Sequence, residues 1–255
     1  MSSSASKSAR KFLTARWQNL ILANYAVPES LLRPLLPPGV ELDIREGQCW
    51  ASLVGFQFLE TRVLGISWPG YRQFPEWNLR FYVRQAGERG VCFVREFVPQ
   101  RLVAWIARTI YNEPYHSARM RMTISESSER LRAEYTVCYG GREHRLMALG
   151  TKPAVRPEES SVEHWFKEHR WGFGTTRRGK QHRYEVIHPT WEVYPVHSFE
   201  ADIDWGVLYG NQWSLMNEVA PSSVVLAVGS AVSVSPSDTT TKSCTRTPPA
   251  DADTR

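Results

Sequence analysis

Short runs in which apolar and polar residues alternate dominate this chain, and turn residues separate them. Alternation with a period of two predicts strands that are buried on one face. The pattern predicts a long first strand over 12–25, hairpins of 40–44 with 49–61, 77–84 with 91–97 and 119–125 with 131–139, shorter strands over 183–187 and 193–196, and a last strand over about 222–235.

Helical periodicity is confined to a few short segments. Apolar residues at helical spacing predict helices over 99–111 and about 160–169, and shorter ones after Pro28 and near 203–209. Alternating hairpins with few helices indicate an α+β fold built on an antiparallel barrel or sheet, and not a parallel nucleotide-binding sheet.

The two ends of the chain differ in composition from the rest. Residues 1–11 are Ser-rich and basic, which predicts a flexible N-terminus. Residues 236–255 are rich in Ser, Thr, Pro and Asp and nearly free of large apolar groups, which predicts a disordered tail. Residues 12–235 contain no internal repeat, and we expect them to form a single domain.

Composition argues against several classes of partner. No apolar run approaches the roughly 18 residues that a membrane-spanning helix needs, and the N-terminus lacks the apolar segment of a signal peptide. The net charge of +5 is scattered along the chain, which is typical of a solvated surface and argues against nucleic-acid binding. The four cysteines lie far apart without a C-x-x-C motif, which favours the reducing cytoplasm over a disulfide scaffold.

The sequence contains no phosphate-binding glycine loop and no nucleophile elbow. His164 and Glu168 lie one helical turn apart, but His169 does not share their face and the H-E-x-x-H motif is absent. We therefore expect no metal and no other cofactor. His169 is expected to pack or hydrogen-bond at the C-terminal end of its helix.

A polar row alternates along one predicted strand: Glu76, Asn78 and Arg80 share one face, and Trp77 and Leu79 share the other. Such a row is either the solvent side of a half-buried sheet or the lining of an interior cavity. Periodicity alone favours the solvent side, because buried carboxylates and guanidinium groups are costly unless they are used.

The segment 107–120 carries more chemistry than an ordinary turn after a helix. Around Pro114 it places Tyr111, Asn112, Glu113, Tyr115, His116 and Arg119. Phenol, carboxylate, imidazole and guanidinium groups are suited to binding or proton transfer. The alternative is a helix end at which tyrosines pack and donate single hydrogen bonds, which explains one tyrosine better than the whole group.

Several motifs along residues 12–235 resemble one family of proteins. They include F-L-T-A-R-W-Q-N-L, L-L-P-P-G-V-E-L-D, S-L-V-G-F-Q-F-L-E-T-R-V-L-G, N-L-R-F-Y-V, V-R-E-F-V-P, Y-N-E-P-Y-H, E-H-R-W-G-F and H-P-T-W. These segments are similar to those of the YqjF-like family of uncharacterised proteins, which have an acetoacetate-decarboxylase-like fold. The resemblance implies a cone-shaped, mostly antiparallel β-barrel with a few peripheral helices and an interior cavity.

Acetoacetate decarboxylases carry a G-R-E-x-W-G-F-P-K-K segment whose first lysine forms a Schiff base. By this resemblance Arg108 matches the arginine and Tyr111 the aromatic residue, while Tyr115 and His116 stand in place of the two lysines. The acidic strand residue of those enzymes falls on Glu76. A Schiff base requires an amine, and no lysine lies between Lys11 and Lys152, so the sequence argues against imine chemistry.

Two hypotheses follow from these residues. The first is an enzyme that performs acid/base chemistry on a small keto or carboxylic acid. In it Tyr115 donates a hydrogen bond or a proton, Glu76 or Glu113 is the base, and His116 orients Tyr115. Substrate binding then falls to Arg80, Asn78, Arg108 and Tyr111.

The second hypothesis is a non-catalytic protein whose barrel binds a small ligand in a pocket rich in Trp and Tyr. In both hypotheses the partner is a small molecule. Homo-oligomerisation is expected by analogy with related decarboxylases, which assemble.

Overall fold

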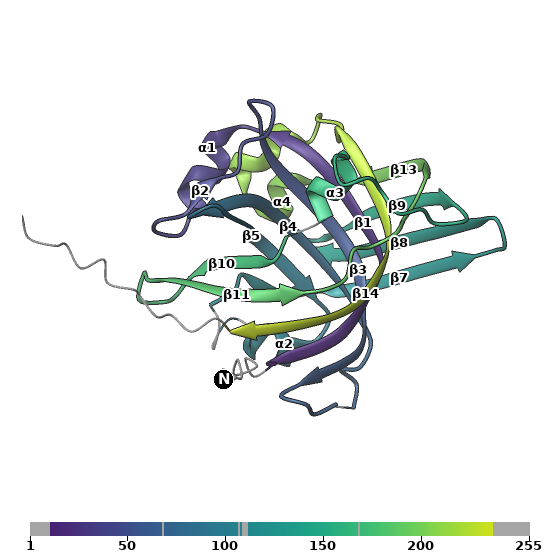
Figure 1. The fold of residues 1–255 in the computed structure, drawn as a ribbon, viewed down its shortest axis with the longest axis horizontal. Helices are drawn as coiled ribbons and strands as arrows, with labels where there is room; N and C mark the ends of the chain where they lie inside the picture. The colour runs from purple at the N-terminus through teal and green to yellow at the C-terminus, as the bar shows by residue number, and fades with distance from the viewer. Residues whose placement is uncertain (1–10, 68, 107, 109–111, 168, 237–255) are drawn as a thin grey trace, which may run out of the picture.

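The computed structural model describes residues 11–236, apart from residues 68, 107, 109–111 and 168. Strands make up most of this part of the chain, and its helices are short (Figure 1). The predicted flexible N-terminus and disordered tail fall outside the described residues, except for Lys11 and for Pro236, which ends the last strand.

Seven strands follow one another around a closed ring in the order β4-β3-β1-β14-β11-β10-β5, and the pairing of β4 with β5 closes it. All of these pairings are antiparallel except that of β10 with β5. The ring strands are β1 (Leu13–Val27), β3 (Cys49–Val63), β4 (Phe74–Gln85), β5 (Glu88–Val98), β10 (Trp171–Thr175), β11 (Gln181–Ile187) and β14 (Ser223–Pro236). The short strands β2 (Glu41–Leu42), β6 (Tyr115–Ser117) and β12 (Val193–Tyr194) pair with β4, β5 and β14.

A second, four-stranded antiparallel sheet projects to one side of the ring (Figure 1). Its order is β13-β9-β8-β7, with bounds β7 (Arg119–Glu126), β8 (Arg130–Tyr139), β9 (Arg142–Thr151) and β13 (Val196–Asp202). The main apolar core contains residues from this sheet and from the ring. Tyr135 of β8 is buried there together with Trp77 of β4 and Ile21 of β1.

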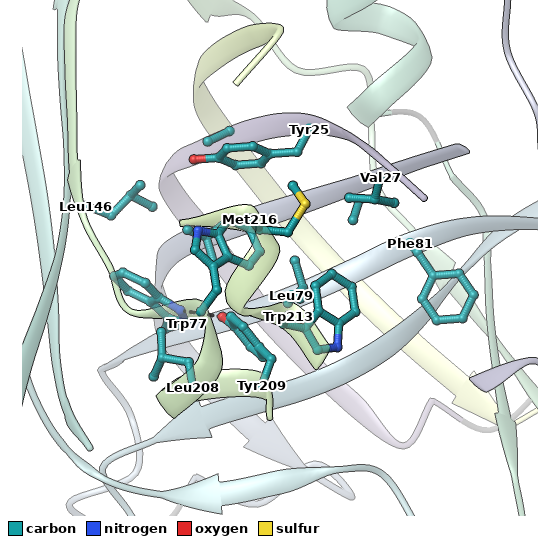
Figure 2. Packing of buried hydrophobic residues seen from close by; sticks show 14 of the residues in the cluster. Tyr25, Val27, Trp77, Leu79, Phe81, Leu146, Leu208, Tyr209, Trp213 and Met216 are labelled. Carbon is teal, nitrogen blue, oxygen red and sulfur yellow. Dashed lines mark hydrogen bonds between the residues drawn. The ribbon is translucent and has the colours of Figure 1, made fainter. Parts of the chain in front are cut away.

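Two helical segments fill this outer core: α4 (Trp205–Tyr209), capped by Asp204, and the 3-10 helix η3 (Asn211–Met216). Figure 2 shows Trp213 and Met216 packed among the buried side chains of the ring. Trp77 Nε1 donates a hydrogen bond of 2.9 Å to the Tyr209 hydroxyl. The outer core therefore contains a polar contact that ties β4 to α4.

The inside of the ring is also packed with aromatic side chains. Trp17 of β1 lies edge-on to Phe56 of β3 and to Trp191, with ring centroids 5.3 and 6.0 Å apart. Alternation along β1, β3 and β14 thus sends one set of side chains to the outer core and the other set to this inner cluster.

Two irregularities change which residues face inward. In β1 the pairing with β3 shifts between Gln18 and Ile21, where Asn19 has a positive φ of 55°. In β5 the pairing with β4 shifts: Arg80 pairs with Phe93, whereas the preceding residue, Leu79, pairs with Arg95. One residue of β5 is therefore left without a partner on β4. A bulge of this kind inserts one residue and reverses the alternation beyond it.

The remaining helices are α1 (Glu29–Leu32), the 3-10 helix η1 (Arg33–Leu35), α2 (Arg101–Ile106) and α3 (Val162–Lys167). The helix predicted over 99–111 coincides with α2, and its predicted C-terminal part lies mostly outside the described residues. The segment predicted over 160–169 is helical only in α3, and its Val162 is exposed rather than inward-facing.

Most predicted strands are present, and the predicted α+β class is confirmed. The hairpin predicted between 40–44 and 49–61 is wrong, because Glu41 and Leu42 pair with β4 instead of β3. Periodicity identifies a strand but not its partner. The pattern also missed β9, β10 and β13, although β9 is a full strand of the second sheet.

Candidate functional site

Three glutamates lie buried together on the inner side of the ring. Glu76, Glu96 and Glu113 are only 3%, 2% and 7% exposed. Asn78, on the same face of β4 as Glu76, is 3% exposed. The expectation that this row faces solvent is therefore wrong, since both faces of β4 are covered in the closed ring.

Strand register brings the groups of this site into line. Asn78 of β4 is opposite Glu96 of β5, and Glu96 is in turn opposite Tyr115 of β6. The Glu96 backbone N–H donates to the Pro114 carbonyl at 3.0 Å, which anchors the chain just before β6. Neighbouring strands thus hold an amide, a carboxyl and a phenol side by side.

Glu76 accepts a hydrogen bond at each of its carboxylate oxygens. The Tyr115 hydroxyl donates to Oε2 at 3.0 Å, and Asn78 Nδ2 donates to Oε1 at 2.9 Å. Glu96 lies within hydrogen-bonding reach of both Tyr115 and Glu76. The two glutamates are therefore close enough to share a proton when one of them is protonated.

The third glutamate has a separate set of partners on β11. Glu113 Oε1 lies 3.3 Å from His182 Nε2, and the Tyr184 hydroxyl is within hydrogen-bonding reach of the same carboxyl. Their cross-strand neighbours are Gly174 and Gly172 of β10. A Cβ atom on Gly174 would lie 2.5 Å from the His182 ring, and one on Gly172 would lie 2.2 Å from the Tyr184 ring, so any larger residue would force these rings to move.

Burial raises the pKa of every acidic group in this site. It raises the pKa of Glu76 to about 7, against the hydrogen bonds from Asn78 and Tyr115 that lower it. Burial and the nearby charges of Glu76 and Glu113 raise the pKa of Glu96 well above its usual range. Burial also raises the pKa of Glu113, while the contact with His182 lowers it.

The pKa of the Tyr115 phenol is held well above its ordinary value by burial and by the glutamate charges. Near neutral pH the site thus contains two neutral acids, Glu96 and Tyr115, and one carboxyl, Glu76, poised between its two forms. Among the described residues, Asn78 Oδ1 and Glu96 Oε1 are buried and have no hydrogen-bond partner. The two residues are direct cross-strand neighbours.

The structure does not bring all of the residues named from the sequence to this place. Arg80 lies on the inner face of β4, but its Nη2 donates to the Phe166 carbonyl of α3 at 3.0 Å. Arg108 is exposed, and its carbonyl accepts a hydrogen bond from Arg177 at 3.3 Å. Tyr111 lies outside the described residues.

His116 lies next to Tyr115 in β6, and its ring contacts Phe97 and Tyr139, with centroids 6.0 and 6.1 Å away. Phe97 belongs to the outer core, whereas Tyr115 packs against the inner cluster. Burial and the charges of Arg95 and Arg108 lower the pKa of His116. Adjacent residues of a strand point to opposite faces, so His116 is directed away from the glutamates.

Sequence reasoning missed three residues of the site: Glu96, His182 and Tyr184. Glu96 was missed because Val91 and Phe93 set an inward alternation that would bring Arg95 inward next. The bulge in β5 brings Glu96 inward instead. No local signal near 181–187 indicated that β11 closes the ring next to Glu113.

In the described part of the chain no group of three His, Cys, Asp or Glu side chains has the arrangement of a metal site. The helices described there are all too short or too polar to cross a membrane.

Comparison with known families identifies the chain. Residues 14–231 match a family model, DUF2071, described as "Uncharacterized conserved protein (COG2071)". The chain belongs to this family. A curated relative, the "Uncharacterized protein YqjF" of Bacillus subtilis (strain 168), is 31% identical over 180 residues, which are 69% of this chain and 72% of YqjF.

Solved structures show that the DUF2071 chain has an acetoacetate-decarboxylase-like fold. The enduracididine biosynthesis enzyme MppR, complexed with the condensation product of pyruvate and imidazole 4-carboxaldehyde, is 14% identical, with a TM-score of 0.61 over 91% of this chain and 90% of that chain. Acetoacetate decarboxylase from Legionella pneumophila is also 14% identical, with a TM-score of 0.56 over 92% and 90% of the two chains. At these identities the likeness establishes the fold alone.

Proposed function

We propose that this DUF2071 chain binds a small carbonyl compound bearing an acidic group and performs acid/base chemistry on it without a Schiff base. The observation that carries the proposal is the hydrogen bond of 3.0 Å from Tyr115 to Glu76, beside Glu96 and inside the ring of strands. Buried carboxyls with raised pKa values are typical of catalytic acids and bases.

Each group has a defined part in this chemistry. Glu76, with a pKa of about 7, accepts a proton from the carbon next to the carbonyl group. The carbonyl oxygen gains negative charge as the enolate forms, and protonated Glu96 donates a hydrogen bond to it. The Tyr115 hydroxyl keeps its hydrogen bond to Glu76 Oε2 and holds that carboxylate in place. The proton held by Glu76 exchanges with solvent before a proton is returned to the same carbon. The compound is restored, and the measurable result is exchange of its α-proton for a solvent proton.

Binding of a short compound falls to Asn78, whose Oδ1 is unpartnered among the described residues. Arg80, two residues beyond Asn78 along β4, has a buried Nε that is likewise unpartnered there and binds the acidic group of a longer compound. Glu113 sets the charge next to Glu76 and Glu96, because a second carboxylate nearby favours their protonated forms. The proposal gives no role to His116 or Arg108.

The ligands named for similar folds support the choice of compound. One structure with this fold is MppR complexed with pyruvate, at 14% identity and a TM-score of 0.59. Tyr115 stands where the resemblance places the Schiff-base lysine, which supports a reaction that proceeds through the enol alone. The free thiols of Cys49, Cys92 and Cys138 support a reducing compartment, and we place the activity in the cytoplasm.

Exchange of α-protons tests the proposal directly. Pyruvate, 2-oxobutyrate and acetoacetate are incubated with the protein in D₂O, and loss of the α-proton signal is followed by NMR. We expect exchange above the uncatalysed rate that falls by at least about 100-fold in Glu76→Gln, the usual contribution of a general base. Glu41→Gln, at a side chain that is 77% exposed, is the matched control. Equal rates in wild type and Glu76→Gln would overturn the proposal.

Borohydride reduction separates this chemistry from imine formation. We expect no adduct after incubation with pyruvate, because Tyr115 and His116 provide no amine. The lysine to inspect is Lys167 of α3, which is 1% exposed. A pyruvate adduct mapped to Lys167 would contradict the proposal, and saturable binding of the panel without any exchange would indicate a binding protein instead.

A further inference from the structure

A second group of polar atoms lies inside the ring, beyond Glu76 and Asn78 along β4. We propose that Arg80, Arg89 and His169 form an anion-binding subsite against α3, which takes the carboxylate or phosphate group of a ligand. The inference deepens the proposed function and rests on it only for the position of the reactive carbonyl.

His169 is the most enclosed member of the group. It is 8% exposed, and its ring lies 4.8 Å from Tyr82 and 5.9 Å from Trp165 between centroids. Among the described residues neither of its ring nitrogens has a hydrogen-bond partner of good geometry, although the Phe166 backbone lies within reach. Burying an imidazole with at least one unsatisfied nitrogen is costly, which indicates that this nitrogen serves a bound molecule or water.

Arg80 presents a free donor to the same region. One end of its guanidinium group is fixed, because Nη2 donates to the Phe166 carbonyl at 3.0 Å and the group lies 5.8 Å from the Tyr82 ring. Its Nε is buried and has no partner in the part of the chain that the structure describes. A guanidinium group held at one side keeps its remaining donors in a fixed direction, which suits an oxyanion.

Arg89 completes the group from the start of β5. Its Nε donates to Asp43 at 2.6 Å, and its guanidinium group lies 4.4 Å from the Trp165 ring. Its Nη2 is buried and lacks a partner among the residues that the structure describes. Asp43 therefore neutralises part of this charge but leaves one donor of Arg89 unused.

The positive charges around His169 favour binding of an anion. Burial and the nearby side chains of Arg80, Arg89 and His188 hold the pKa of His169 well below its ordinary value. Two cations beside a neutral imidazole create a positive potential in a place shielded from solvent. An oxyanion there would accept hydrogen bonds from all three side chains and offset that potential.

The position of the subsite defines the shape of the ligand. Arg80 follows Glu76 by four residues in β4, roughly 13 Å between their Cα atoms at the usual strand rise. Asn78 lies between them on the same face. A ligand that reaches both the carboxyl cluster and the subsite therefore carries its anionic group several bonds from its carbonyl. A molecule as short as pyruvate would occupy one end only.

Calorimetric titration with simple anions tests the subsite without any turnover. Inorganic phosphate, sulfate, acetate and glutarate are titrated into the full chain. We expect saturable binding that weakens at least about tenfold in Arg80→Lys and in His169→Gln, since a charge-assisted hydrogen bond contributes 1.5–3 kcal/mol. Arg84→Lys, on the same strand with a side chain that is 56% exposed, is the matched control. Circular dichroism and thermal unfolding establish that each variant is folded.

The outcomes separate this inference from the proposed function. Stronger binding of phosphate and sulfate would assign the subsite to a phosphate ester, and stronger binding of acetate and glutarate would assign it to a carboxylate. Absence of saturable binding for all four anions would overturn the subsite, as would unchanged affinity in both folded variants. Either result could stand beside wild-type α-proton exchange, whereas loss of that exchange with anion binding retained would overturn the proposed function alone.

Discussion

The Tyr115 hydroxyl donates a hydrogen bond of 3.0 Å to Glu76 Oε2, although 39 positions separate the two residues in sequence. Their strands do not pair with each other, because β5 lies between β4 and β6. The contact is thus made across one intervening strand, whose own Glu96 is in reach of both groups. The contact therefore links the protonation state of Glu76 in β4 to the position of the chain around Pro114.

The first prediction concerns the pKa of Glu76. Tyr115→Phe removes a donor that stabilises the carboxylate form, so the pKa of Glu76 should rise further above about 7. Loss of a hydrogen bond to a charged group, 1.5–3 kcal/mol, corresponds to roughly one to two pKa units. The pH profile of α-proton exchange, or ¹³C NMR of labelled glutamate, measures the shift.

Tyr139→Phe is the matched control for this measurement. Tyr139 also lies near β6, but its ring packs against Phe97 in the outer core. If the pKa of Glu76 shifts equally in Tyr115→Phe and Tyr139→Phe, or in neither, the Tyr115 hydroxyl does not act on Glu76.

The second prediction concerns stability against pH. A carboxyl whose pKa is raised on folding stabilises the folded state below its unfolded value, and this contribution is lost as the pH rises through the folded value. For Glu76 the pKa rises from 4.5 in the unfolded chain to about 7 in the folded protein. The free energy of unfolding should therefore fall by about 3 kcal/mol as the pH rises through this range. Glu76→Gln should therefore gain stability over wild type as the pH rises from 5 to 8.5 in urea unfolding.

The measurement compares the free energies of unfolding of wild type and Glu76→Gln at each pH. The lowered pKa of His169 contributes with the opposite sign, because a histidine kept neutral by folding gains stability as the pH rises. That contribution cancels between wild type and Glu76→Gln. Glu218→Gln, at an exposed site, is the control, and its stability relative to wild type should not change with pH. If the stability of Glu76→Gln relative to wild type is also independent of pH, Glu76 is not held protonated by folding.

The third prediction concerns the outer core. Tyr209→Phe leaves the buried N–H of Trp77 without its acceptor, 2.9 Å away (Figure 2). An unsatisfied buried donor costs about 1–3 kcal/mol, so the free energy of unfolding should fall by that amount. In the Trp77→Phe background the same change should cost less, since no donor remains. An equal cost in both backgrounds would show that the hydrogen bond contributes nothing.

The inward face of β4 illustrates what the sequence does and does not predict. Alternation correctly placed Glu76 with Asn78 and Trp77 with Leu79 on opposite faces. Whether the polar face meets solvent or an enclosed interior depends on closure of the ring. That closure is made by β10 and β11, which are distant in sequence from β4. No periodicity within one strand contains this information.

Glu96 and Arg80 illustrate two further limits. The position of Glu96 depends on a bulge, and no glycine or proline of β5 marks the shift that occurs between Phe93 and Arg95. Arg80 faces inward as its spacing indicates, but its partner is a backbone carbonyl of α3, 86 positions away. Faces follow from local sequence, whereas partners follow from tertiary packing.

The last prediction uses the close approach of β10 to the carboxyl cluster. In Gly174→Ala the new Cβ would lie 2.5 Å from the His182 ring and 3.3 Å from Glu113 Oε1. The ring must therefore move, which costs about 1–3 kcal/mol and removes the contact that lowers the pKa of Glu113. Urea unfolding of Gly174→Ala, His182→Ala and the double variant isolates the cause. If displacement of the ring is responsible, Gly174→Ala should cost much less once His182 is already alanine, because the space is then free. Additive costs would show instead that the loss of stability does not come from the contact with the His182 ring.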